Sequence, residues 1–239
     1  MRTLTYTFVQ NDMVMLNLWL SYYKKYFADL IVYSFNTEKD TLPKLDELTR
    51  KYGAGYELLQ EYHGDKIDGT PSILLGFARD RQVDFLQNHD WVLCCNLDEI
   101  LIAKKGNLTD LMKRHKDELI ALPSEGYDVV QAEDESQIDY LKPYFQQRKY
   151  MVKNVNYNKI VISRIPLRWT EGLHKLDTMT DEESRNIRNS GLYLIHLKHA
   201  DLQREEGRAG PYKVHLDSNI MEHKPEERVL IPKYFKKLL

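Results

Sequence analysis

The stretch WVLCCNLDEIL at residues 91–101 carries the strongest local signal in the sequence. Its first part, residues 91–97, is an apolar run bounded by polar residues, which is typical of a strand that is covered on both faces of a parallel sheet. Asp98 and Glu99 follow at the carboxyl end of that strand, where buried carboxylates are costly unless a cation or hydrogen bonds satisfy them. Two interpretations are open: the acidic pair binds a hard divalent cation, which prefers oxygen ligands, or it caps a helix or pairs with an arginine.

Strand and helix patterns alternate before residue 91. Strands rich in apolar, aromatic and β-branched residues are predicted at residues 4–9, 30–35 and 56–62. Helices with a 3.6-residue period are predicted between them, at residues 13–27, 42–52 and about 70–88. This order predicts an α/β fold with an open sheet and helices on both faces. Ligands of such sheets bind beyond the carboxyl ends of the strands. The expected ligand-binding loops are therefore those at residues 10–12, 36–41, 63–69 and 96–99.

The second half of the chain is less regular. A helix is predicted at residues 107–115, and a polar loop at residues 133–149. Strands are predicted at residues 119–122 and 127–131, on either side of a Pro-Ser-Glu-Gly loop, and at residues 159–163 and 192–197. Neither an internal repeat nor a dividing linker is visible, so we expect one domain over residues 1–239.

Composition places the chain among ordinary globular proteins. Its 34 Lys and Arg against 36 Asp and Glu give a net charge of −2, which argues against a dedicated nucleic-acid binder. The 16 Tyr suit a site for sugars or bases, or a half-buried core. The two adjacent cysteines, Cys94 and Cys95, form no disulfide framework and are expected to be buried on a strand. With neither a signal-peptide core nor a membrane-spanning run in sight, we expect a cytoplasmic protein.

Residues 91–101 resemble the D-x-D-E segment of GT-A-fold glycosyltransferases, in the family-2-like and family-92-like group. Other segments match that family in order. FVQND at residues 8–12 resembles its first strand and "N-E" loop, and GFARD at residues 76–80 resembles its "G-x-A-R-N" helix. The later pattern "K-v-i-x-R … G-x-H … l-x-H" is matched by segments starting at Lys159, Gly172 and Leu192. Together the matches span residues 4 to about 200.

The sequence departs from the family pattern in two places. Asn96 stands where the first Asp of D-x-D is usual. An amide can still hydrogen-bond there but supplies no charge, so metal affinity would be weaker. Asp80 stands in place of the usual Asn beside Arg79.

The resemblance implies a Rossmann-like mixed open sheet and a divalent metal, Mn²⁺ or Mg²⁺, that holds the donor diphosphate. The implied metal ligands are Asp98 and His196, with His174 as an alternative. The implied donor contacts are Gln10, Asn11, Asp12, Asp40, Arg79 and Asn96. Arg204 is a further candidate, because the glycines and basic residues after His196 would suit a lid over the diphosphate. The candidates for a catalytic base are Asp128, which we prefer, Glu125 and Glu171. The simpler interpretations are a strand-end histidine bonded to backbone, solvated arginines and polar turns.

The implied function is transfer of a sugar, with inversion, from a nucleotide-sugar donor, expected to be a UDP-sugar, to a hydroxyl of a glycan or glycoconjugate. Negative charge develops on the leaving diphosphate, and a metal with nearby cations stabilises it. Residues 1–103 would form the nucleotide-binding half, residues 104–200 the acceptor and metal half, and residues 201–239 a lid and tail.

Other functions stay open. A nucleotidyltransferase acting on a sugar phosphate would share the sheet and the carboxylates, but should show a Gly-rich loop after the first strand, which residues 10–13 do not. A non-catalytic carbohydrate-binding domain of the same fold is the third interpretation. The basic, amphipathic end at residues 233–239 would suit a peripheral membrane contact or an ordinary terminal helix.

Overall fold

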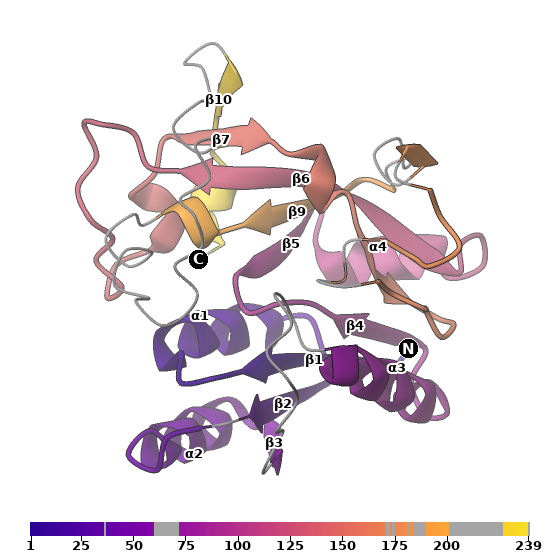
Figure 1. Cartoon of the computed structure of the whole chain (residues 1–239). Coiled ribbons are helices and arrows are strands. Elements are labelled where there is room, and N and C mark those ends of the chain that lie inside the picture. Colours follow the sequence, from indigo (N-terminus) through magenta and orange to yellow (C-terminus); the bar gives the residue numbers. More distant parts are fainter. Residues whose placement is uncertain are drawn as a thin grey trace.

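A mixed sheet of ten strands organises the described part of the chain. The computed structural model describes residues 1–35, 37–59, 72–170, 173, 175–180, 182–183, 190–200 and 227–238. Eight of the strands follow the order β10-β7-β6-β8-β4-β1-β2-β3, while β9 pairs with both β5 and β6 (Figure 1). The expected α/β class with a mixed, open sheet is confirmed.

The first half of the chain is the regular part of this sheet. Its strands are β1 (Thr3–Val9), β2 (Asp29–Phe35), β3 (Gly55–Leu59) and β4 (Trp91–Cys94), and all neighbouring pairs among them are parallel. The helices between them are α1 (Met13–Tyr23), α2 (Leu42–Tyr52) and α3 (Ser72–Leu86). Each predicted strand and helix is present here, although α1 ends at Tyr23 rather than near residue 27. Residues 60–62, predicted as the end of the third strand, lie outside the described residues.

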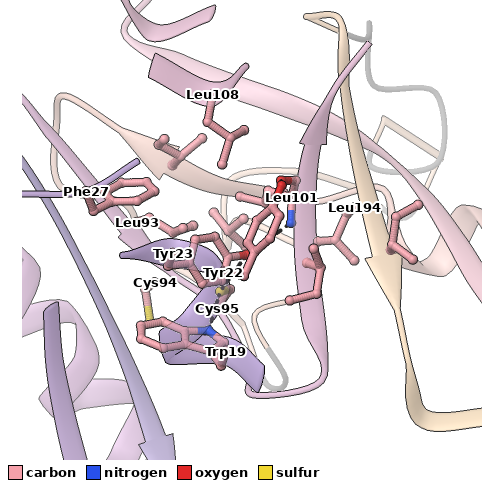
Figure 2. Packing of buried hydrophobic residues seen from close by; sticks show 14 of the residues in the cluster. Trp19, Tyr22, Tyr23, Phe27, Leu93, Cys94, Cys95, Leu101, Leu108 and Leu194 are labelled. Carbon is pink, nitrogen blue, oxygen red and sulfur yellow. Dashed lines mark hydrogen bonds between the residues drawn. The ribbon is translucent and has the colours of Figure 1, made fainter. Parts of the chain in front are cut away.

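The adjacent cysteines show that helices cover both faces of this sheet. Cys94 pairs in register with Tyr6 of β1, whose hydroxyl donates to the carbonyl oxygen of Ala78 in α3 at 2.6 Å. Cys95 points to the opposite face, where its Sγ lies 3.4 Å from Nε1 of Trp19 in α1 (Figure 2). Successive side chains of a strand alternate between faces, so α3 covers one face and α1 the other. Both cysteines are free and buried, as expected, and burial raises the pKa of the Cys95 thiol to about 12.

The second half extends the sheet mainly with antiparallel pairs, and β6 and β9 form a parallel one. Its strands are β5 (Glu99–Ala103), β6 (Ala121–Val130), β7 (Tyr150–Lys153), β8 (Ile160–Ser163), β9 (Leu192–His196) and β10 (Arg228–Leu230). Its helical segments are α4 (Leu108–His115) and the short 3-10 helices η1 (Tyr144–Gln146), η2 (Val155–Tyr157), η4 (Lys198–Ala200) and η6 (Phe235–Lys237). Strand β8 pairs antiparallel with β4 and so joins the two halves.

Strand β6 corrects the prediction for residues 119–131. A loop was expected at Pro123-Ser-Glu-Gly, but β6 runs unbroken through it, with a register shift between Leu122 and Pro123. Its first residues pair with β8 and the rest with β9 on one side and β7 on the other. The segment is a strand because neighbours far along the chain satisfy its backbone hydrogen bonds.

The strand predicted at residues 91–97 is also shorter than expected. Strand β4 ends at Cys94, and β5 begins at Glu99 after a turn. Near the C-terminus, Phe235 is buried against Phe145 and Tyr193, so this aromatic ring of the basic end packs on the protein itself. None of the described helices has the length and apolar character needed to cross a membrane.

Candidate active site

The turn between β4 and β5 places Asp98 beside His196. Strand β5 pairs antiparallel with β9, which sets Glu99 opposite His196, and the carbonyl oxygen of Asp98 accepts from the Leu197 amide at 2.8 Å. Oδ2 of Asp98 lies 3.6 Å from Nε2 of His196. The Asp98 side chain is 19% exposed and that of His196 4% exposed. The structure therefore brings together two of the three predicted metal ligands at the carboxyl end of β4.

Asp128 fixes the orientation of the His196 ring. Strands β6 and β9 are parallel here, with Asp128 in register with His196. Nδ1 of His196 lies 2.7 Å from Oδ1 of Asp128, and the other carboxylate oxygen accepts from Nδ2 of Asn154 at 2.6 Å. The Tyr157 ring stacks on the imidazole, with 3.9 Å between the ring centroids. These contacts leave Nε2 as the ring nitrogen that faces Asp98.

The two carboxylates make this a site where positive charge is stabilised. Burial alone would lower the pKa of His196, but the charge of Asp98 and the hydrogen bond and charge of Asp128 outweigh it and raise that pKa to about 9. Without a cation at the site, the two carboxylates therefore favour the positively charged form of the imidazole.

Gly126 lets a second segment reach the site. A Cβ at this position would lie 2.4 Å from the carbonyl carbon of Tyr157 and 2.5 Å from the carbonyl oxygen of Asn154. The two chains are tied there, because the Gly126 amide donates to Oδ1 of Asn158 at 2.9 Å and its carbonyl oxygen accepts from the Asn154 amide at 3.0 Å. This close approach carries Asn154 to Asp128 and Tyr157 to His196.

Gly126, Asn154 and Tyr157 were not predicted as site residues. A glycine inside a strand pattern often marks a close backbone approach, so Gly126 carried a usable signal. Asn154 and Tyr157 carried none, because they are the N-cap and the last residue of a short 3-10 segment without periodicity.

Glu99, the second acidic residue of the motif, points into a buried ion pair. Its Oε1 accepts from Nζ of Lys159 at 2.5 Å, and both side chains are fully buried. Its Oε2 accepts from the Asn96 amide at 3.1 Å, and the Asn96 side chain lies 3.4 Å from Oε1. The ion-pair interpretation therefore describes Glu99, with a lysine in place of the expected arginine, while Asp98 is the carboxylate that faces His196.

Glu125 lies on the other face of β6 from Asp128. Burial alternates along this strand, with Ser124, Gly126 and Asp128 buried and the odd-numbered residues between them half-buried. The Glu125 carboxylate lies 2.8 Å from Nζ of Lys104 and 2.7 Å from Nζ of Lys153. Burial favours a higher pKa, but these two lysines lower the pKa of Glu125 to about 2. Glu125 is thus a firmly ionised group that does not face the Asp98–His196 pair.

The predicted donor contacts lie on loops at the carboxyl edge of the parallel strands. Asp12 caps α1 by accepting from the Met15 amide at 3.1 Å. Asn11 has a left-handed backbone with φ of 56°, and its side chain bonds the amide of Glu38 at 2.9 Å and the Glu38 carboxylate at 3.1 Å. The loops after β1 and β2 are therefore tied together.

The remaining predicted residues are dispersed. Gln10 and Asp40 are exposed on these two loops. Arg79 of α3 donates to the carbonyl oxygen of Trp169. The predicted residues Glu171, His174 and Arg204 lie outside the described residues.

Across the described residues, no group of three or more His, Cys, Asp or Glu side chains could hold a metal ion. Asp98 and His196 form a pair whose spacing still fits one. Two donors at about 2.1 Å from the same ion lie roughly 3 Å apart at a right angle and about 4 Å apart when opposite. The observed 3.6 Å falls between these limits.

Comparisons with known proteins give no family. No family model matches the chain, and no curated protein matches it. Among solved structures, S. aureus TarS is 13% identical at a TM-score of 0.33, covering 69% of this chain and 28% of TarS. Core-mannan synthase A (CmsA/Ktr4) from Aspergillus fumigatus, in its Mn/GDP form, is 10% identical at a TM-score of 0.30. The match covers 54% of this chain and 42% of the synthase. A Bacillus anthracis protein named as a glucose-1-phosphate thymidylyltransferase, in complex with sucrose, is 10% identical at a TM-score of 0.34. The match covers 82% of this chain and 71% of that protein.

The chain thus spans less than half the length of the first two structures. With TM-scores of 0.30 to 0.34, these likenesses carry no conclusion about activity.

Proposed function

We propose that the protein is a metal-dependent glycosyltransferase. It moves a sugar from a nucleotide-sugar donor, which we expect to be a UDP-sugar, to a hydroxyl of a glycan or glycoconjugate. One observation carries the proposal. Nε2 of His196 faces the Asp98 carboxylate at 3.6 Å, while Nδ1 is held by the buried Asp128. A carboxylate that orients a histidine from behind is a common arrangement at metal sites, because it fixes the tautomer and raises the basicity of the ligand. The motif resemblance implies Asp98 and His196 among its candidate ligands, and this geometry supports the proposal that they act together.

Two protein ligands suit the metals that bind phosphates. Mg²⁺ is usually held by one or two carboxylates, with water and substrate phosphates completing its shell; here His196 would add an imidazole to the carboxylate of Asp98. The charge of the cluster also fits. With a neutral His196, the carboxylates of Asp98, Glu99 and Asp128 exceed the ammonium of Lys159 by two negative charges, which one divalent cation would neutralise. When bound, such an ion would stabilise the charge that develops on the leaving diphosphate.

The residues of this chain would divide the remaining work. Asp98 and His196 would hold the cation, and Asp128 would position His196, because both of its oxygens are engaged and it is 1% exposed. The nucleotide would lie over the loops after β1 and β2, where open sheets bind ligands and where Gln10 and Asp40 are exposed. An inverting transfer also needs a base for the acceptor hydroxyl. Asp128 is committed to His196 and Glu125 faces away, so Glu171 stays as the third predicted candidate.

Calorimetry with UDP, in the presence and absence of Mn²⁺, tests the metal-donor site. We expect UDP binding to need Mn²⁺ and to weaken at least tenfold in Asp98→Ala and in His196→Ala. The control is Glu47→Gln, an exposed carboxylate on α2 that should bind UDP as the unmodified protein does. UDP binding that is absent, or that ignores both Mn²⁺ and Asp98→Ala, would refute the proposal.

Turnover assays then separate the three functions. A glycosyltransferase should slowly hydrolyse one member of a panel of nucleotide-sugars. Release of pyrophosphate from a nucleoside triphosphate and a sugar phosphate would instead identify a nucleotidyltransferase. Mn²⁺-dependent UDP binding without either turnover would favour a non-catalytic domain.

A further inference from the structure

Lys159 is a buried cation at the junction of the segments that form the site. It stands directly before β8, its side chain is fully buried, and its carbonyl oxygen accepts from both the amide and the hydroxyl of Ser124 at 2.9 Å. The backbone of Lys159 is therefore anchored to β6, two residues before Gly126. From this fixed point the side chain contacts both arms of the proposed metal site.

The first arm is the turn that carries Asp98. Nζ of Lys159 lies 2.5 Å from Oε1 of Glu99, and the same carboxylate accepts from the Asn96 amide at 3.1 Å. The Glu99 amide in turn donates to the Asn96 carbonyl oxygen at 3.2 Å. The turn of residues 96–99 is thus closed around a carboxylate whose charge Lys159 balances.

The second arm is the His196 ring. Nζ of Lys159 lies 5.0 Å from the centroid of the Tyr157 ring, within the range of a cation–π contact. That ring stacks on the imidazole of His196 at 3.9 Å. One ammonium group therefore supports the acidic turn through Glu99 and the imidazole through Tyr157.

Stability alone is a weak reason for such a pair. Removing two charges from water is costly, and apolar residues of similar volume often replace a buried ion pair without loss. The Glu99–Lys159 pair instead contacts a neighbour of each group that would share a cation: Asn96 in the turn that carries Asp98, and Tyr157, which stacks on His196. We infer that Lys159 is a positioning residue, which holds the Asp98 carboxylate and the His196 imidazole at the spacing that binds a divalent cation. This inference rests on the proposed function.

The test compares three variants with the unmodified protein. Lys159→Met removes the ammonium and keeps the length of the side chain. The double variant Glu99→Gln with Lys159→Met removes both charges, so that no lone charge is buried and the fold is protected. Leu48→Ala is the control. It removes a buried side chain of α2, which leaves a cavity in the core and lowers stability without changing a residue of the site.

Two measurements decide the outcome: the Mn²⁺ dissociation constant by electron paramagnetic resonance, and the NMR signals of the His196 ring without metal. We expect both Lys159 variants to bind Mn²⁺ about 10- to 100-fold more weakly and to show displaced His196 signals, while Leu48→Ala changes neither. If the unmodified protein and both Lys159 variants bind Mn²⁺ equally, the inference is overturned and the proposed function stands. If the unmodified protein binds no Mn²⁺, the proposed metal site fails. The ring signals then decide the positioning role, which is overturned if they are unchanged.

Discussion

Replacing Gly126 with alanine tests whether close packing builds the site. No residue with a side chain fits at position 126 without a movement of the backbone. The added Cβ would meet the carbonyl carbon of Tyr157 at 2.4 Å and the Cβ of Tyr157 at 2.5 Å. Ordinary contacts between such atoms need at least 3.4 Å, so the two chains must separate by about 1 Å. The atoms in the way belong to backbone and to a Cβ, which cannot swing aside as the end of a long side chain can.

The size of the effect follows from overpacking. Forcing extra atoms into a packed interior costs about 1–3 kcal/mol. For a protein of this length each kcal/mol moves the melting temperature by about 2–4 °C, so we expect Gly126→Ala to melt about 2–12 °C lower. The shift would also move Asn154 away from Asp128 and Tyr157 away from His196, so Mn²⁺ binding should weaken together with stability.

The chain offers a matched control in Gly76. It lies inside α3, and a Cβ built there meets nothing within 4 Å. Alanine favours a helix over glycine by about 0.5–1 kcal/mol, so Gly76→Ala should melt slightly higher. Thermal unfolding followed by circular dichroism measures both variants. The reasoning is refuted if Gly126→Ala melts at or above the temperature of the unmodified protein, because the predicted contact would then cost nothing.

Three further changes have definite expected outcomes. Asp128→Asn should fold but bind Mn²⁺ about 10- to 100-fold more weakly in a titration, since a neutral amide orients His196 less firmly; unchanged affinity would contradict the role given to Asp128. Glu125→Gln should lower the free energy of unfolding by about 1–3 kcal/mol at pH 7, because Lys104 and Lys153 lower the pKa of Glu125 to about 2. The carboxylate stabilises the fold fully above its unfolded pKa of about 4.3 and loses that effect as pH falls toward 2, so urea unfolding at several pH values should show the gap closing in acid. A difference in unfolding free energy between Glu125→Gln and the unmodified protein that persists at about pH 2 would contradict this explanation. Asp12→Ala removes the N-cap of α1 and should cost about 0.5–2 kcal/mol in the same assay, and an unaltered unfolding midpoint would rule out that contribution.

The first half of the fold was predictable because its signals are local. The apolar period of α2 and the glycine after it, Gly53, fixed that helix at residues 42–52, as the structure has it. The Pro-Ser-Glu-Gly segment misled for a physical reason. Turn-forming residues dominate it, but its pairing partners in β8 and β9 lie roughly 35 to 70 residues further along the chain, and only the folded protein reveals them.

One feature of the candidate site, the closeness of Asp98 to His196, was predictable from the motif. Asp98 and His196 were predicted as ligands from the resemblance, and the structure places them side by side. That Glu99 forms a buried ion pair while Asp98 faces His196 was not predictable, because it depends on Lys159, which is 60 residues from Glu99 and fully buried. Which of Glu125 and Asp128 lies beside His196 was also hidden, since a loop was expected where β6 turns the two side chains to opposite faces.

The burial of Cys94 and Cys95 has a practical consequence for spectroscopy. A thiol reacts with labelling reagents as its thiolate, and the raised pKa of both buried thiols keeps that form scarce. A cysteine introduced at an exposed position, such as Lys39 beside Asp40, should therefore take up a nitroxide selectively while both native cysteines remain in place. Distances from such a label to a bound Mn²⁺ would then locate the ion without altering any residue of the core.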